Sequence, residues 1–116
     1  MAVDRRPIDQ MVLDVGPEAF QRLVKLFDEE TRGVVLELRR LFAAQDWREL
    51  GRQAHSLKHA TSSFGLVELA EIAAQIEKAA DALQPIEAGE QLTRLETCTA
   101  GELKRLALLL EKVGNR

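Results

Sequence analysis

The centre of the chain carries the stretch Gln53-Ala54-His55-Ser56-Leu57-Lys58-His59-Ala60-Thr61-Ser62-Ser63-Phe64-Gly65. An α-helix turns by about 100° per residue, so residues spaced alternately by three and four share one face. Six residues in and just before this stretch follow that spacing: Trp47, Leu50, Ala54, Leu57, Thr61 and Phe64. The pattern predicts a helix that buries this face. His55 lies nearly opposite it, so we expect its ring to reach solvent.

Basic side chains surround His55 on the same helical projection. Six residues fall within about 60° of it: Arg48, Gly51, Arg52, Lys58, His59 and Ser62. Glu49 is expected to project elsewhere. The pattern therefore predicts an exposed imidazole in a local patch of positive charge, on a helix anchored from behind. Such an arrangement suits the handling of a phosphoryl group, because nearby cations offset its charge.

The stretch also resembles the signature of histidine-containing phosphotransfer (HPt) domains, which combine a His-x-Leu-Lys-Gly run with a second glycine six residues further on. His55, Leu57, Lys58 and Gly65 match this pattern, and His59 replaces its first glycine. The resemblance implies that His55 is the phosphoryl acceptor and that Lys58 compensates the phosphate charge. Gly65 is expected to end the helix as a left-handed cap.

Two further residues are accessory candidates. Arg52 lies near His55, but a surface ion pair explains an exposed arginine equally well. In HPt domains the glycine at the position of His59 leaves room for the aspartate of a partner. A ring at this position would narrow that approach, add a hydrogen-bond donor to the phosphoryl oxygens, or restrict the set of partners.

The four-residue spacing of His55 and His59 also allows two imidazoles to chelate a metal ion. Two ligands do not make a stable site, and no carboxylate lies beside them in the sequence, since Glu68 and Glu71 belong to the next helix. We therefore predict no metal site and no cofactor on this chain. Mg²⁺ is expected only on a partner receiver domain.

Composition places the chain among single-domain, all-α proteins. Its 116 residues are 46% hydrophobic and 30% charged, with three prolines and no tyrosine, and helix-forming residues dominate. We expect one domain over residues 1–116, with residues 1–6 as a flexible tail. The net charge of −3 argues against nucleic-acid binding, which needs a broad basic face.

Several features predict a cytoplasmic location without a membrane span. The N-terminal residues do not resemble a signal peptide, and no run approaches the roughly 18 apolar residues of a transmembrane helix. Cys98 is the single cysteine, so it cannot form a disulfide within the chain. Its place in a helical pattern predicts a small core residue.

The remaining apolar patterns predict an antiparallel up-down four-helix bundle with a short extra N-terminal helix. The short helix is expected over about 7–14. The four main helices are expected over about 17–44, with a bend allowed near Gly33, and over 47–63, 66–83 and 90–113. Asp46 is expected to cap the second main helix in a capping box with Glu49. Residues 84–89, which begin with Gln84-Pro85, are predicted to form a loop.

The resemblance to HPt domains, together with these features, implies a monomeric phosphorelay intermediate. His55 would accept a phosphoryl group from the phosphoaspartate of a receiver domain, in a response regulator or a hybrid histidine kinase, and pass it to another or take it back. The sequence shows no glycine-rich phosphate loop and no catalytic triad pattern, so we predict a phosphohistidine carrier and not an enzyme. The alternative is a helical adaptor that binds a signalling partner through the same face without phosphate chemistry.

Overall fold

Five helices make up the described part of the chain. The computed structural model describes residues 5–114, apart from the side chains of residues 110 and 112–114. The helices are α1 (Arg5–Val15), α2 (Pro17–Ala43), α3 (Trp47–Ser63), α4 (Val67–Asp81) and α5 (Pro85–Gly114). No strand occurs within the described range.

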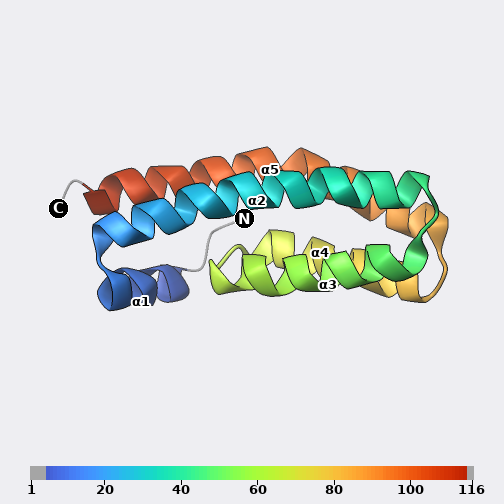
Figure 1. Ribbon diagram of the computed structural model, residues 1–116, viewed down its shortest axis with the longest axis horizontal. Helices are drawn as coiled ribbons and strands as arrows, with labels where there is room; N and C mark the ends of the chain where they lie inside the picture. The colour runs from blue at the N-terminus through green and yellow to red at the C-terminus, as the bar shows by residue number, and fades with distance from the viewer. Residues whose placement is uncertain (1–4, 115–116) are drawn as a thin grey trace.

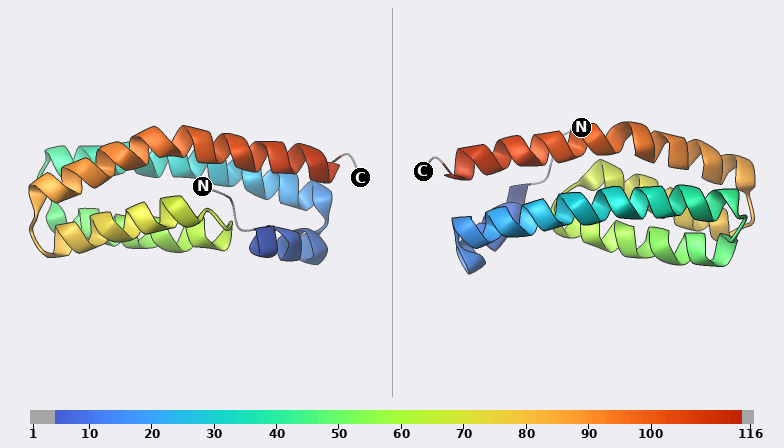
Figure 2. Two further views of the ribbon diagram at one scale, coloured as in Figure 1. Left: turned by 180° about the vertical axis from the view of Figure 1, so that it is seen from behind. Right: turned by 45° about the horizontal axis from the view of Figure 1, so that its top comes forward.

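The four longer helices run up and down in sequence order (Figure 1). Neighbours in the resulting ring are α2 and α3, α3 and α4, α4 and α5, and α5 and α2. Helices α2 and α5 extend beyond the other two, and α1 folds back beneath the overhanging part of α2, beyond the ends of α3 and α4 (Figures 1 and 2). The predicted all-α bundle with a short N-terminal helix is confirmed.

One continuous core fills the bundle, because each helix buries one apolar stripe. The largest fully buried side chains come from all five helices: Ile8, Phe20, Leu38, Leu41, Leu50, Leu66, Leu69, Ile72, Ile76, Leu92, Leu95 and Leu103. The predicted inner face of α3 is confirmed, since Leu50, Ala54, Leu57 and Thr61 are all buried. Cys98 is partly buried and packs against this core, as expected.

The end of α3 is fixed by a Schellman motif, in which Gly65 follows the cap residue Phe64. Gly65 has a φ of 71°, a left-handed conformation that favours glycine. Its N–H donates to Ser62 O at 3.0 Å, and the N–H of the buried Leu66 donates to Thr61 O at 3.0 Å. These bonds satisfy two free carbonyls of α3 and turn the chain sharply into α4. The predicted cap is confirmed.

Two local predictions need correction, and one alternative left open by the sequence, a bend in α2, is decided. Arg5 and Arg6, assigned to a flexible tail, form the first turn of α1; residues 1–4 lie outside the described residues. Helix α2 continues through Gly33 as one helix. The loop predicted for 84–89 is helical, because Pro85 takes the first helical position, where proline loses no hydrogen bond.

Helix packing explains why glycine is useful in this first part of α5. A Cβ atom at Gly89 would lie 2.9 Å from Cζ of Phe42. The glycine therefore lets α5 approach the aromatic ring of α2 closely. The sequence pattern gave no sign of this contact, since it depends on where α2 and α5 meet.

Candidate functional site

His55 lies midway along α3, whose two ends are both held against α2 by aromatic pairs. Trp47 meets the ring of Phe42 edge to face, with centroids 5.7 Å apart. Phe64 stacks on Phe27 with centroids 4.1 Å apart. The inner face of α3 is thus fixed, and the side chain of His55 on the opposite side is 49% exposed. The predicted exposure of His55 is confirmed.

A carboxylate from α4 holds one nitrogen of this ring. Nδ1 of His55 lies 2.7 Å from Oε2 of Glu77. A carboxylate can only accept, so the hydrogen bond places the ring proton on Nδ1. The lone pair of the neutral ring then lies on Nε2, the nitrogen directed away from Glu77. Glu77 therefore selects which nitrogen of His55 can act as a nucleophile.

Lys58 binds the other oxygen of the same carboxylate. Its Nζ donates to Oε1 of Glu77 at 3.1 Å, and the Glu77 side chain is 23% exposed. Partial burial acts to raise the pKa of Glu77. The hydrogen bonds from Lys58 and His55 outweigh that effect, so the pKa of Glu77 lies below its usual value. Glu77 is therefore ionised at neutral pH and lies between the imidazole and the ammonium group.

His59 contacts the remaining nitrogen of His55. The two Nε2 atoms are 3.1 Å apart, and the rings meet edge to face with centroids 4.5 Å apart. Because Nε2 of His55 carries the lone pair, Nε2 of His59 carries the proton and donates it. The exposed ring of His59 therefore covers the free nitrogen of His55 in this arrangement.

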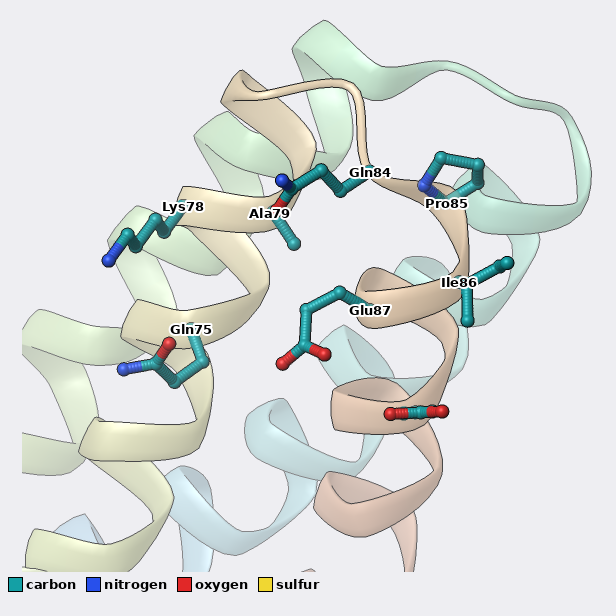
Figure 3. Close-up of a pocket in the computed structure, with 8 residues that line it drawn as sticks. Gln75, Lys78, Ala79, Gln84, Pro85, Ile86 and Glu87 are labelled. Atoms are coloured by element: carbon teal, nitrogen blue, oxygen red, sulfur yellow. The ribbon is translucent and has the colours of Figure 1, made fainter.

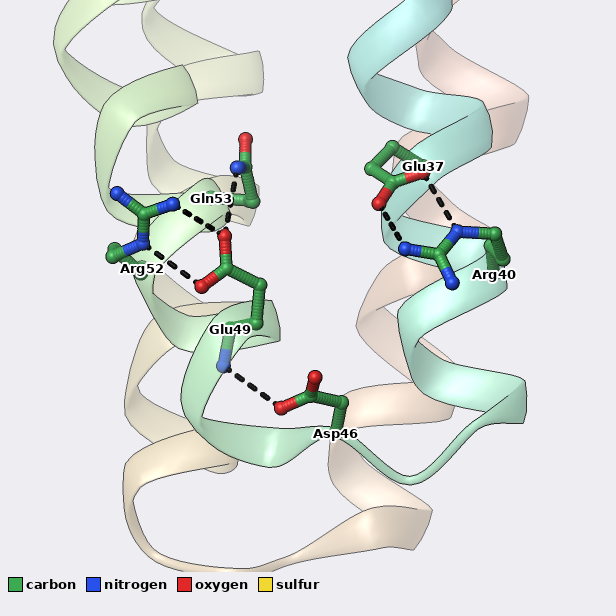
Figure 4. A network of polar contacts seen from close by, with 6 residues as sticks. All are labelled: Glu37, Arg40, Asp46, Glu49, Arg52 and Gln53. Atoms are coloured by element: carbon green, nitrogen blue, oxygen red, sulfur yellow. Dashed lines mark hydrogen bonds and ion pairs between the residues drawn. The ribbon is translucent and has the colours of Figure 1, made fainter.

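Arg52 does not take part in this cluster. Its Nε donates to Oε2 of Glu49 at 2.9 Å, one turn earlier on α3 (Figure 4). Glu49 was expected to lie outside the helical face around His55, and its carboxylate pairs with Arg52. Arg52, followed by Gln53, lowers the pKa of Glu49 to about 2. Two of the cations expected around His55, Arg52 and Lys58, are thus paired with carboxylates.

The same network changes the predicted capping box. Asp46 accepts from the backbone N–H of Glu49 at 3.3 Å, which confirms it as the N-cap residue (Figure 4). The Glu49 carboxylate does not return to the backbone of Asp46, because it binds Arg52 and Gln53. The N–H of Asp46 instead donates to Leu41 O at 3.0 Å.

Glu77 is the site residue that the sequence did not reveal. The expected solvent side of α3 is partly covered by α4: Gly51 is buried, and a Cβ there would lie 2.9 Å from Oδ1 of Asp81. This close approach brings Glu77 to His55. The available signal was that Glu77 follows the buried Ile76 and precedes the buried Ala80 by three, at the edge of the apolar stripe. That position does not show which neighbouring helix the carboxylate faces.

One pocket of the described chain lies away from these residues. It has a volume of about 650 Å³ and lies between α4 and the start of α5, where Gln75, Lys78, Gln84 and Glu87 project (Figure 3). It contains none of the predicted site residues. Within residues 5–114, no group of three or more His, Cys, Asp or Glu is placed to hold a metal ion. No helix of the described chain has the length and apolarity needed to cross a membrane.

Comparison with known protein families agrees with this geometry. The family model described as Hpt domain matches residues 22–115, which include all of α3 and α4 and most of α2. No curated protein and no solved structure matches the chain. Hpt domains are helical bundles that carry phosphoryl groups on a histidine in two-component phosphorelays, where they interact with receiver domains and kinases. Because the match covers most of the sequence, this chain belongs to the Hpt domain family.

Proposed function

We propose that His55 is the residue that carries the phosphoryl group, accepting it from the phosphoaspartate of one receiver domain and passing it to the aspartate of another. The observation that carries this proposal is the bond between His55 Nδ1 and Glu77, at 2.7 Å, on a half-exposed ring. It leaves Nε2 as the nucleophile and fixes the plane of the ring. A half-exposed ring held in one orientation on a rigid helix supplies the positioning that phosphoryl transfer requires, once His59 turns away from Nε2.

The proposed step needs no proton transfer on this chain. The lone pair of His55 Nε2 forms a bond to phosphorus, and the bond between phosphorus and the aspartyl oxygen of the receiver breaks. The electron pair leaves with the aspartate as a carboxylate. The ring becomes a phosphorylated imidazolium that keeps its proton on Nδ1. In the reverse step an aspartate oxygen attacks phosphorus, and neutral His55 is restored.

Glu77 acts in this scheme as a positioning and charge-stabilising residue. The positive charge that develops on the His55 ring faces the Glu77 carboxylate through the Nδ1 proton. A carboxylate that orients a histidine and stabilises its charged form serves the same purpose in catalytic triads. Mg²⁺ is needed only on the receiver domain in this scheme, since Glu77 and Lys58 supply charge stabilisation on this chain.

Lys58 and His59 have separate proposed roles. Lys58 uses one of its three N–H donors on Glu77 and has two others for the phosphoryl oxygens. His59 has to turn away from His55 Nε2 before attack, and its N–H can then donate to the phosphoryl group. Breaking an exposed hydrogen bond costs about 0.5–1.5 kcal/mol. His59 would therefore slow the first encounter by no more than about tenfold. Arg52 remains a weaker accessory candidate, because Glu49 binds it.

The partner surface is proposed to include the side of α3 that faces α2. A groove of about 130 Å³ lies there, lined by Phe27, Val34, Gln53, Ser56 and Ala60 among others. Ser56 is the residue next to His55, so a receiver domain seated over the ring would also reach this groove. We propose that the chain works as a monomer in the cytoplasm and that the contact is transient, as suits a carrier that must release each partner.

Incubation with a phosphorylated receiver domain tests the proposal. We expect acid-labile, alkali-stable label on the wild-type chain and on His59→Ala, and none on His55→Ala. Arg94→Ala, an exposed substitution on α5 distant in sequence from the cluster, serves as a control for surface charge. Label that depends on His59 alone would reassign the acceptor. Receiver binding that survives His55→Ala with no label on any variant would instead support the adaptor function.

A further inference from the structure

We propose that His55 and His59 together form a chelating site for one late transition metal ion, of the class of Ni²⁺, Cu²⁺ and Zn²⁺, and that the bound ion reversibly blocks the carrier nitrogen. The metal site itself does not depend on the proposed function. The consequence for phosphoryl transfer rests on His55 being the acceptor. The ion would be a blocking ligand and not a cofactor of the transfer.

The separation of the two nitrogens carries the proposal. The Nε2 atoms of His55 and His59 lie 3.1 Å apart. Imidazole nitrogens bind zinc at about 2.0–2.1 Å. Two such nitrogens on one ion are therefore about 2.9 Å apart in octahedral coordination and about 3.4 Å apart in tetrahedral coordination. The pair therefore has the spacing of a chelate before any ion arrives, and the ion would replace the hydrogen bond between the two rings.

The second observation is the carboxylate behind His55. Histidines that bind metals usually donate their other N–H to a carboxylate or carbonyl, which fixes the tautomer and makes the ligating nitrogen more basic. Nδ1 of His55 makes such a bond to Glu77 at 2.7 Å. The sequence did not show that this carboxylate lies near the pair. Glu77 supports the site from behind and is not itself a ligand.

Proton balance is satisfied at the pair. His55 already presents its lone pair on Nε2. His59 moves its proton from Nε2 to Nδ1 through solvent, which its exposed ring allows, so neutral imidazoles bind without net proton release. Water fills the remaining positions of the ion. Imidazole nitrogen suits nickel, copper and zinc, whereas Mg²⁺ prefers oxygen, so the Mg²⁺ of a receiver domain should not compete.

Titration of the full chain, without an affinity tag, with NiCl₂ and separately with ZnCl₂ tests the site. Calorimetry is expected to show one ion per chain, with affinity lowered at least tenfold in His59→Ala and in His55→Ala. Glu77→Gln should lower it by about tenfold, as loss of a supporting carboxylate does. Excess Mg²⁺ should not displace the ion. Circular dichroism of each variant establishes that the helices are intact.

A matched variant separates chelation from the mere presence of two imidazoles. His59→Ala combined with Ser62→His keeps two histidines on the same exposed side of α3 but sets them seven residues apart, about 10 Å along the axis. We expect this variant to bind no better than His59→Ala. Ion binding within threefold of wild type in either variant would overturn the proposal, as would binding equally strong in His55→Ala.

The blocking effect has its own readout. Each chain is mixed with a sub-stoichiometric amount of phosphorylated receiver domain, with and without ZnCl₂. The rate of phosphoryl loading with zinc is then compared with the metal-free rate of the same variant. Zinc should slow loading of wild type at least tenfold more than loading of His59→Ala, because effects on the receiver are the same in both. If zinc slowed wild type and His59→Ala equally, the ion would not block His55 Nε2. Calorimetry would still decide whether the two histidines chelate the ion. If wild type takes no label even without zinc, the proposed function fails and the binding result still stands.

Discussion

Two glutamates, Glu77 on α4 and Glu102 on α5, show how this bundle uses burial in opposite ways. Glu77 is 23% exposed and accepts from both His55 and Lys58. Glu102 is 5% exposed, and Arg105, which forms an ion pair with it, is itself half exposed. The pKa of Glu77 is lowered, whereas burial, opposed by Arg105 and helped by Glu68, raises the pKa of Glu102.

The difference shows that loss of solvent alone does not decide the charge of a carboxyl group. Burial raises the pKa of both groups, and the neighbours decide the outcome. Donors from α3 surround Glu77 and keep it charged, which is the state that can orient His55. Glu68 of α4 lies near Glu102 as a second carboxylate and favours a proton there. The environment of Glu77 keeps a charge next to His55, whereas the environment of Glu102 makes the free energy of unfolding depend on pH.

The largest effect is expected where the charged carboxylate meets the carrier ring. Glu77→Gln removes the negative charge that faces the His55 imidazolium and should slow phosphoryl acceptance by about tenfold, or about 1.4 kcal/mol in the barrier. Single-turnover loading from a phosphorylated receiver measures it. Glu71→Gln, an exposed change on the same helix, is the control. Equal rates for Glu77→Gln and wild type would mean that the contact only orders the resting ring.

The second prediction concerns the stability of the fold and the buried Glu102. Glu102→Gln removes a carboxylate that is costly to bury and should raise the free energy of unfolding at neutral pH by on the order of 1 kcal/mol. Because the folded pKa is raised, wild-type stability falls as pH rises from the unfolded value of about 4.3 through the folded pKa. The gain should therefore disappear in acid, where both states are protonated. Urea unfolding at several pH values measures it.

The same unfolding series on Glu77→Gln sharpens the contrast. The folded pKa of Glu77 is lowered, so its contribution is present above the unfolded pKa and is lost as pH falls through the folded pKa. Glu77→Gln should thus be slightly destabilising near neutrality, by less than about 1 kcal/mol for a partly exposed group, and neutral in acid. If both variants shifted stability in the same direction, the two environments would not differ as described.

A smaller effect is expected from the cation beside Glu77. Lys58→Gln removes one of the two hydrogen-bond donors to Glu77, so the pKa of Glu77 should rise toward its usual value. NMR titration of the carboxyl group measures this change. Phosphoryl loading should slow by about threefold, since partly exposed charges are screened. Lys78→Gln, an exposed substitution on α4, is the matched control. An unchanged Glu77 titration would show that His55 alone accounts for the lowered pKa.

The smallest effect is expected at Arg52. Its guanidinium binds Glu49, one turn away from the cluster, so Arg52→Ala should change the loading rate by less than about twofold. Initial rates at physiological ionic strength measure it. A loss larger than that of Lys58→Gln would show that Arg52 leaves Glu49 when a partner binds, and would return it to the site.

Local sequence determined most of the fold and pointed to His55 as the proposed acceptor. The alternating apolar spacing gave the inner faces of α3 and α4, because a stripe of this period can be buried only by a helix. Gly65 gave the end of α3, because few other residues adopt a positive φ readily. His55 and Lys58 were singled out by a short run that resembles the HPt signature, and helical spacing placed both on the outer side of one helix.

Only the tertiary structure decided what these side chains meet. The Glu77 contact joins residues 22 positions apart, and it depends on how closely α4 approaches the buried Gly51 of α3. The close approach of α5 to α2 at Gly89 likewise depends on where Phe42 packs. Helical periodicity states which side of a helix a residue occupies, but it carries no information on which helix covers that side. The charge, tautomer and accessibility of His55 are set by those neighbours, and so they follow from the fold.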